Sequence, residues 1–382
     1  MISLYLFCFI PAAIWLVLFF LNKEIHAIEA VASLSVAFLI AGITHICSYK
    51  SQTGDYEYWS GQIVGAKFFE DWTEKYEEPI YRDESYTVSV PDGKGGTKTE
   101  TRTRRVFSHY EWRTEYHEEY AVAYSNIDTS YRISKSKYLE FLKDFGGEKK
   151  VKGDRSTSNR SSHSIKGDDY DYVTVNSNNP VIPVTKRVAF ENRLKAGSVW
   201  DKVPPPAELN IPDRPENDNP WRSNRLLGIA KNDFSILELD KLNAVLGPTK
   251  KIDINIVGFD SDNSMMGQHV ESKWKGGNKN SLTIVYCRKE SKRPNMVHCF
   301  GWSKSDICKE NIEHILMNND LGDDVVPLIQ EEIQKNYTKP DFKEYDYIQI
   351  QPGGWAWFWF LTLVILSQGV IIWISLRNSL NK

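Results

Sequence analysis

Apolar residues gather in three long runs, two at the start of the chain and one near its end. The first runs from Ile2 to Leu21 without a charged residue, and the second runs from Ile25 to Cys47 with few ionisable ones. The third runs from Trp355 to Leu376. Each approaches the ~20 residues that an α-helix needs to cross a bilayer. The pattern predicts three membrane-spanning helices.

Only Asn22, Lys23 and Glu24 separate the first two runs, so residues 1–47 are expected to form an antiparallel transmembrane hairpin. Residues 48–354 then form a body that is tethered to the membrane at both ends. The first run is expected to be retained. No basic segment precedes it, it is longer than the ~7–15 residues of a signal-peptide core, and no small-residue cleavage site follows it.

The basic residues near the runs predict an orientation. Lys23 lies in the short turn, and Arg377 and Lys382 follow the third run, whereas Lys50 lies on the opposite side. By the positive-inside rule, the turn and the C-terminus are expected in the cytoplasm. The body is therefore expected on the non-cytoplasmic side of a cell (inner) membrane.

Residues 48–202 change to a period of two, which predicts a β-rich domain. From Tyr110 to Tyr124 apolar and charged residues alternate, which is typical of one long half-buried strand, with Tyr56–Val64 and Lys67–Tyr76 as its neighbours. Thr97–Arg105 alternates threonine with charged residues, so neither face is apolar. Together with the turn Pro91–Gly96, this segment predicts a projecting hairpin.

The rest of this domain contains less regular structure. Ser134–Phe145 predicts a helix with Ser134 as its N-cap and Gly146 after its end. Residues 147–169 predict a flexible loop, and Phe190–Ala196 predicts a helix. Residues 203–225 are rich in proline and are expected to form a linker between domains.

Helices and strands alternate in residues 226–350, which predicts an α/β sandwich domain. The predicted helices are Ser235–Leu246, Met265–Trp274, Ile307–Met317 and Val325–Tyr337, and the predicted strands are Lys251–Phe259, Ser281–Cys287 and Met296–Trp302. The expected fold class is thus α+β and membrane-anchored, with a transmembrane helix at residues 355–376 closing the chain.

Charge and cysteine content exclude several classes of protein. The net charge of −3 indicates no nucleic-acid partner, although Arg102, Arg104 and Arg105 make the predicted hairpin locally basic. Cysteines 287, 299 and 308 of the body lack CxxC spacing, so neither a zinc ribbon nor a disulfide framework is indicated. Because alternation places His298 and Cys299 on opposite faces of a strand, buried apolar cysteines are the better interpretation.

The segments "LELDKLNAVLG", "KIDINIVGF", "ESKWKGGNKNSLTIVYC" and "VHCFGWSKSDI" resemble the TPM domain family, over about residues 235–337. The resemblance implies a membrane-tethered domain that faces the periplasm, lumen or exterior. Members of that family have been linked to phosphatase activity or calcium binding, and many act in the assembly or repair of membrane complexes. The overall layout also resembles multi-span membrane proteins of large tailed phages and prophages.

Few residues are candidates for chemistry. Asp260 and Asp262 directly follow a predicted strand, where their carboxylates can bind a hard cation such as Ca²⁺ if a third carboxylate, such as Asp240 or Asp323, joins them. The alternative is a polar surface turn. No catalytic residue or other cofactor is indicated. Residues Trp355, Trp357 and Trp359 are expected to mark the membrane interface.

Three classes of function remain open. The first is a membrane-anchored, non-enzymatic binding or assembly protein, whose partners are the lipid bilayer and another protein or further copies of itself. The second is a metal-dependent phosphohydrolase, as the resemblance implies. The third is a transport or channel component, which requires polar groups such as Glu29 and His45 to face other polar groups within the spans.

Overall fold

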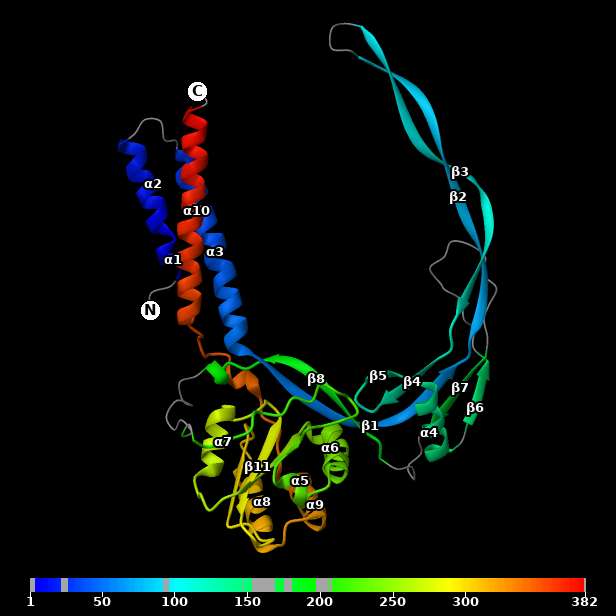
Figure 1. Ribbon diagram of the computed structural model, residues 1–382, viewed down its shortest axis with the longest axis vertical. Helices are drawn as coiled ribbons and strands as arrows, with labels where there is room; N and C mark the ends of the chain where they lie inside the picture. The colour runs from blue at the N-terminus through cyan, green and yellow to red at the C-terminus, as the bar shows by residue number, and fades with distance from the viewer. Residues whose placement is uncertain are drawn as a thin grey trace. The chain divides into compact units, whose positions relative to one another are not determined.

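The computed structural model describes residues 4–21, 27–91, 96–146, 148–152, 169–174, 181–196, 206 and 208–380. It is a mixed α+β structure that divides into two compact units (Figure 1). Unit 1 comprises residues 1–60 and 185–382, and unit 2 comprises residues 61–184. The predictions for residues 92–95, for most of the loop at 147–169 and for Pro204 and Pro205 lie outside the described residues.

Four apolar helices of unit 1 lie alongside one another: α1 (Leu4–Phe7), α2 (Phe9–Leu21), α3 (Ala27–Thr53) and α10 (Gly354–Leu380) (Figure 1). Among the described residues, two helices are long and apolar enough to cross a membrane, at Ile28–Thr53 and Gly354–Ser375. The first predicted helix is interrupted at Cys8. Pro11 then lies in the first turn of α2, where a missing N–H costs no hydrogen bond, so α2 begins near the proline instead of kinking at it.

The α/β domain of unit 1 contains one four-stranded sheet in the order β12-β11-β10-β9. Strands β9 (Leu226–Gly228), β10 (Asp253–Asp260) and β11 (Ser281–Arg288) are parallel, and β12 (Met296–Phe300) is antiparallel to β11. The helices are α5 (Ala230–Asp233), α6 (Ile236–Lys250), α7 (Met266–Trp274), α8 (Asp306–Asn318) and α9 (Val326–Asn336), with 3₁₀ turns η3 (Asp323–Val325) and η4 (Phe342–Tyr345). The predicted order of elements in this domain is confirmed.

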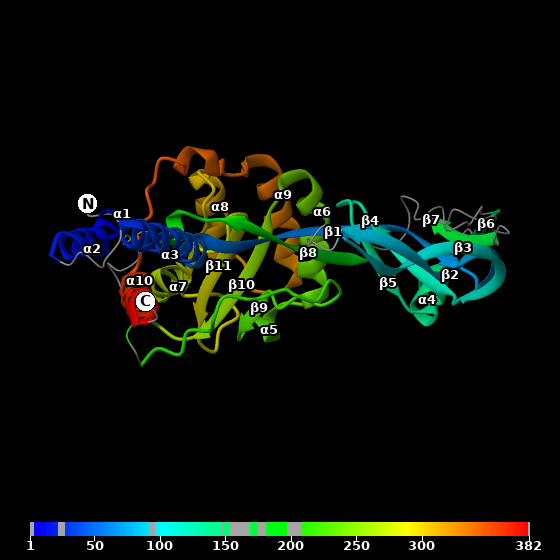
Figure 2. The ribbon, with the colours of Figure 1, turned by 90° about the horizontal axis from the view of Figure 1, so that it is seen from above.

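A hydrophobic core lies on each face of this sheet. On one face, α6, α8 and α9 pack through residues such as Leu242, Ile312 and Ile333. On the other face, α7 packs through Val270 and Trp274, so the sheet lies between the two sets of helices (Figure 2). The described part of the proline-rich segment joins this second core: Ile211 is buried there, and the Trp274 Nε1 donates to the Pro212 carbonyl at 3.0 Å.

Strands β1 (Gly54–Phe69) and β8 (Pro183–Glu191) are fastened to the α/β domain by one buried arginine. Arg225 is 1% exposed, and its guanidinium donates to Asp253 at 2.8 Å and to Asp240 at 2.6 Å. Its Nη2 also donates to the hydroxyls of Ser60 at 2.7 Å and Thr185 at 3.0 Å. The predicted helix at 190–196 is wrong, because residues up to Glu191 extend β8 and only the short 3₁₀ turn η1 (Leu194–Ala196) follows.

Close backbone approach also joins β1 to this domain. The Asn280 side chain accepts from the Tyr58 N–H and donates to the Tyr58 carbonyl, so it pairs with β1 as a neighbouring strand would. A Cβ at Gly247 of α6 would lie 2.1 Å from the Ser60 carbonyl, so only glycine allows this contact. Gly276 and Gly277 both have positive φ angles in the turn before β11.

Unit 2 contains a sheet in the order β5-β4-β1-β7-β6 and a separate hairpin. The sheet strands after β1 are β4 (Tyr120–Ser125), β5 (Ser130–Ile133), β6 (Glu148–Lys152) and β7 (Asp169–Thr174). Helix α4 (Lys135–Phe145) begins at its predicted cap, where Ser134 accepts from the Lys137 N–H, and Gly146 follows with φ of 63°. Both predictions for this helix are confirmed.

The hairpin consists of β2 (Trp72–Pro91) and β3 (Thr97–His117). The prediction of one strand from Tyr110 to Tyr124 is wrong, because Glu118 and Glu119 separate β3 from β4. β3 pairs with β2, whereas β4 pairs with β1 and β5. The two neighbours predicted for that long strand also differ from the structure. The predicted strand Tyr56–Val64 lies within β1, and β2 begins inside the predicted strand Lys67–Tyr76.

Candidate functional site: the helix bundle and the β2–β3 hairpin

The acidic turn after β10 is exposed and has one lysine beside its two carboxylates. The Asp260 and Asp262 side chains are each 70% exposed, and the Lys289 Nζ lies 4.0 Å and 3.7 Å from them. The Asn295 side chain donates to Asp262 at 2.8 Å. The Lys289 ammonium and the Asn295 amide, both from the same domain, therefore contact this turn.

The two carboxylates expected to complete a metal site lie elsewhere. Asp240 is bound to Arg225 and to the Ser223 hydroxyl, and Asp323 accepts from the Ser235 N–H at 2.8 Å. In the described ranges, no group of three His, Cys, Asp or Glu residues is arranged to hold a metal ion. Asp260 and Asp262 thus form a polar turn without a third carboxylate.

A second polar cluster lies near the same edge of the sheet, and sequence analysis missed it. Arg288 donates to both oxygens of Asp233, at 2.8 and 2.6 Å, and the Tyr286 hydroxyl donates to the same carboxylate at 2.5 Å. Burial and the Asp233 charge raise the pKa of Tyr286 above its ordinary value. Because each of these groups is matched to another, the cluster fastens α5 to β11.

The cysteines of the body are buried, as expected. Cys287 lies in the core beside α7, and Cys299 and Cys308 lie in the core on the opposite face of the sheet. Burial raises the pKa of Cys287 and of Cys308 to about 11, so both thiols are protonated at neutral pH. His298 lies on the α7 side, where its Nε2 is 2.9 Å from Glu271, and so on the opposite face of the sheet from Cys299 and Cys308.

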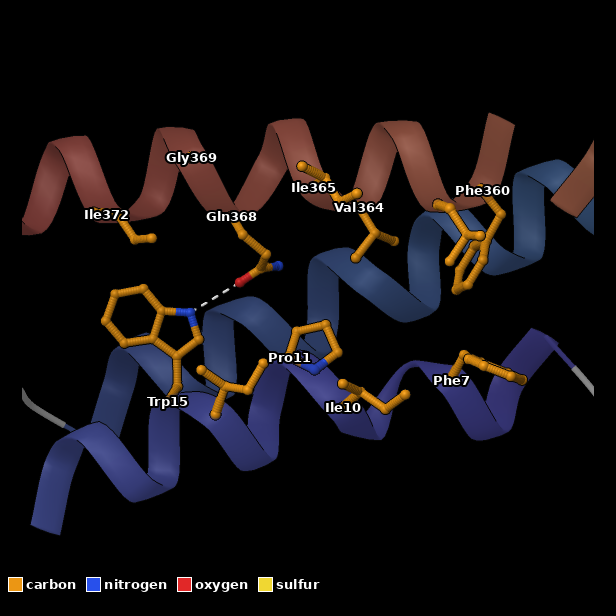
Figure 3. Close-up of a pocket in the computed structure, with 12 residues that line it drawn as sticks. Phe7, Ile10, Pro11, Trp15, Phe360, Val364, Ile365, Gln368, Gly369 and Ile372 are labelled. Carbon is orange, nitrogen blue, oxygen red and sulfur yellow. Dashed lines mark hydrogen bonds between the residues drawn. The ribbon is translucent and has the colours of Figure 1, made fainter. Parts of the chain in front are cut away.

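The apolar helices are joined by hydrogen bonds between polar side chains. The Gln368 Oε1 of α10 accepts from the Trp15 Nε1 of α2 at 2.8 Å and from the Ser33 hydroxyl of α3 at 2.7 Å. Figure 3 shows Trp15 and Gln368 pointing toward each other. The Ser375 hydroxyl donates to Glu29 at 2.6 Å. Each polar group has a partner on a neighbouring helix, which is how such groups hold helices together in lipid.

A pocket of ≈ 540 Å³ opens beside the Trp15–Gln368 bond, between α1, α2 and α10 (Figure 3). Its lining is apolar apart from these two polar groups and includes Phe7, Pro11 and Val364. The size and lining are typical of sites that bind small apolar molecules.

The tryptophans at the start of α10 separate into two sets. Trp355 is 77% exposed and Trp359 is 52% exposed, so their indoles lie on the outside of the helices. Trp357 is half-buried, and its ring packs edge-on against Phe7 at 5.1 Å. Two of the three expected interface residues are thus available to a surrounding medium, and the third packs against α1.

The β2–β3 hairpin exposes a row of aromatic side chains. Tyr81, Phe107, Tyr110, Trp112 and Tyr116 are each 45–61% exposed. The Phe107 ring lies 4.9 Å from that of Tyr110 and 6.1 Å from that of Tyr81, so the row continues along one side, which we call the aromatic face. Exposed aromatic surface of this kind marks interaction sites.

A β-bulge keeps the aromatic face continuous. Ile80 pairs with His109 and Tyr81 pairs with Phe107, so Ser108 is an extra residue in β3. Beyond the bulge, the alternation of β3 is shifted by one. The opposite side, which we call the charged face, therefore carries Lys98, Glu100, Arg102, Arg104, Glu111, Arg113 and Glu115.

The hairpin is long for an isolated ribbon. β2 contains 20 residues and β3 contains 21, and Figure 1 shows them as a twisted two-stranded ribbon. An isolated two-stranded hairpin is only marginally stable in water, because it has no apolar layer to bury. The exposed rings of the aromatic face and the free strand edges make the hairpin the leading candidate for a binding surface.

Comparison of the chain with protein-family models, with curated proteins and with solved structures finds no match.

Proposed function

We propose that this chain is a multi-pass membrane protein whose body binds another protein through the β2–β3 hairpin, in a non-enzymatic binding or assembly role. The observation that carries the proposal is the outward-facing apolar surface of the helices. Phe20, Ile28 and Ile365 are each 70–76% exposed, and Leu39 is 64% exposed. Exposing such surface to water costs about 25 cal/mol per Å², whereas a bilayer covers it at no such cost.

The helices have the other properties that a bilayer requires. Polar side chains on neighbouring helices are hydrogen-bonded to each other: Trp15 and Ser33 donate to Gln368, and Ser375 donates to Glu29. We infer three spans, made by α1 with α2, by α3 and by α10, with Trp355 and Trp359 near a headgroup layer. The charge distribution supports a body on the non-cytoplasmic side of an inner membrane.

The assembly role fits the α/β domain better than hydrolysis does. We keep the resemblance of residues 235–337 to TPM domains as a proposal; these residues form α6-β10-α7-β11-β12-α8-α9. Within that domain, Asp260 and Asp262 face Lys289, which opposes the binding of a cation between them. A role in which the domain holds or positions a partner needs no metal and no nucleophile.

Photo-cross-linking in cells tests both parts of the proposal. A photoreactive amino acid replaces Trp112 on the aromatic face, and in a control chain it replaces Tyr347, which is 77% exposed in unit 1. Membranes are washed at alkaline pH before analysis. We expect the full chain to stay in the washed membranes, and we expect irradiation to give a discrete protein adduct at position 112 and not at 347.

Two results would contradict the proposal. Release of the full chain by the alkaline wash would show that the helices do not span the membrane. Equal, diffuse labelling at positions 112 and 347 would show that the aromatic face has no specific protein partner.

A further inference from the structure

The two edges of the β2–β3 hairpin differ in how well they are protected. The outer edge of β2 is interrupted by Pro79, which has no N–H to donate. β3 contains neither proline nor glycine over its 21 residues, and in the described part of the chain only β2 pairs with it. A long strand edge of this kind is a template for pairing with another strand.

We propose that β3 pairs antiparallel with β3 of a second copy of this chain, so that two hairpins form one four-stranded sheet. The inference rests on the proposed function, since it uses the hairpin as the binding surface, and it names the partner. The evidence for a second copy is that the charges along β3 are complementary to themselves in one register.

In that register, Val106 of one copy lies opposite Val106 of the other on the two-fold axis, and the bulge residue Ser108 of each copy stays unpaired. Lys98 of one copy then lies opposite Glu115 of the other, Glu100 opposite Arg113, and Arg102 opposite Glu111. By symmetry each pair occurs twice. Opposite charges that face each other across an antiparallel pair are stabilising.

Neighbouring registers lack this match. A shift of two residues in one direction places Lys98 opposite Arg113 and Glu100 opposite Glu111. A shift of two in the other direction places Glu100 opposite Glu115 and Arg102 opposite Arg113. Like charges directly opposite each other are destabilising. A shift of one residue brings charged side chains to the aromatic face, because strand side chains alternate.

The bulge at Ser108 makes the segments of β3 before and after it compatible with this pairing. Since it shifts the alternation by one, the charged residues on both sides of it lie on the same face. The aromatic face also matches: Thr101 lies opposite Trp112, and Thr103 lies opposite Tyr110. Pairs of a β-branched and an aromatic side chain are favourable across strands.

Within one hairpin, like charges face each other at two places. Within one copy, Glu111 lies opposite Glu78, and Glu115 lies opposite Glu74. Arg113 bridges Glu78 and Glu111, at 2.9 and 3.2 Å. A second copy brings Arg102 beside Glu111 and Lys98 beside Glu115, so each glutamate gains a cation across the new edge.

Charge reversal tests the pairing on the full chain in lipid nanodiscs or detergent, by sedimentation equilibrium. We expect the parent to form dimers, and we expect Arg102→Glu or Glu111→Arg alone to weaken dimerisation roughly tenfold. The double variant restores opposite charges and is expected to dimerise as the parent does. Arg293→Glu, at an exposed position of unit 1, is the control and should change nothing.

Cross-linking between chains that each carry one introduced cysteine tests the register, in a background with Cys47 replaced by serine, because the other four native cysteines are buried. A chain with Thr99→Cys mixed with a chain with Thr114→Cys should be joined by a short thiol cross-linker, because these positions face each other. Thr103→Cys mixed with Thr114→Cys is the control, displaced by four residues, or about 13 Å, and should not be joined.

The inference would be overturned by a chain that stays monomeric, by single charge reversals without effect, or by cross-linking at the displaced pair. None of these three results would by itself contradict the proposed function. A discrete Trp112 photo-adduct whose mass is not that of two chains would retain a binding role for the hairpin and would overturn self-pairing.

Discussion

Arg225 shows how far a single buried residue can determine the arrangement of unit 1. Its guanidinium is bonded to two carboxylates of the α/β domain and to one hydroxyl on each of β1 and β8. A buried ion pair is weak evidence for net stability, because the desolvation of both charges offsets their attraction. Removing only one partner, however, leaves the other charges buried and unmatched.

We therefore expect Arg225→Met to lower the free energy of unfolding by about 3–5 kcal/mol, because Asp253 and Asp240 remain in the interior. Denaturant titration of the full chain in detergent, followed by tryptophan fluorescence, would measure this change. Arg293→Met is a matched control, since the Arg293 side chain is 63% exposed beside Asp320 and its ion pair is worth little. Equal stability of the two variants would contradict the role given to Arg225.

At the scale of elements, the packing of the apolar helices depends on the small residues of α3. Ser33, Ala37 and Ala41 are fully buried, and Ala37 and Ala41 pack with Phe360 and Val364 of α10. These three small residues, spaced three to four positions apart, therefore lie on one face of α3. Small side chains let helix backbones approach closely, which is what drives helix association where there is no hydrophobic effect.

We expect Ala37→Leu to destabilise the helix bundle by about 1–3 kcal/mol, because added methyl groups have no space between α3 and α10. The measurement is the fraction of protein that stays soluble after heating in detergent. Ala32→Leu makes the same change at an exposed position of α3 and should leave the heating curve unchanged. A similar loss in both variants would mean that Ala37 is not a packing contact.

At the scale of the whole molecule, the proposed three spans predict where the body and the C-terminus lie. Of these spans, only α10 lies between the body and residue 382, so a membrane-spanning α10 places them on opposite sides of the membrane. Orientation is then set by the basic residues of the turn and tail.

Labelling with a membrane-impermeant thiol reagent would measure this topology. In a chain with Cys47 replaced by serine, Tyr347→Cys is expected to react from the outside of intact cells, because that side chain is 77% exposed. Lys382→Cys is expected to react only after the membrane is permeabilised. Labelling of both positions from one side would exclude three spans.

The sequence alone determined those features that depend on neighbouring residues. The apolar runs predicted α3 and α10, and Ser134 with Gly146 predicted both ends of α4. The order of helices and strands from Ser235 onward was also predicted. These features follow from the spacing of apolar residues and from local backbone hydrogen bonds, which a single segment carries by itself.

Only the tertiary structure decided which segments pair. The alternation of residues 110–124 is interrupted at Glu118 and resumes in the same phase at Tyr120, so the period alone does not show that β3 pairs with β2 while β4 pairs with β1. The contacts of Arg225 with Asp240 and Ser60 join residues far apart in the chain, and the same holds for Asp233 with Arg288. Which distant residues pair depends on shape and charge in three dimensions, and it cannot be read from the local periodicity of one segment.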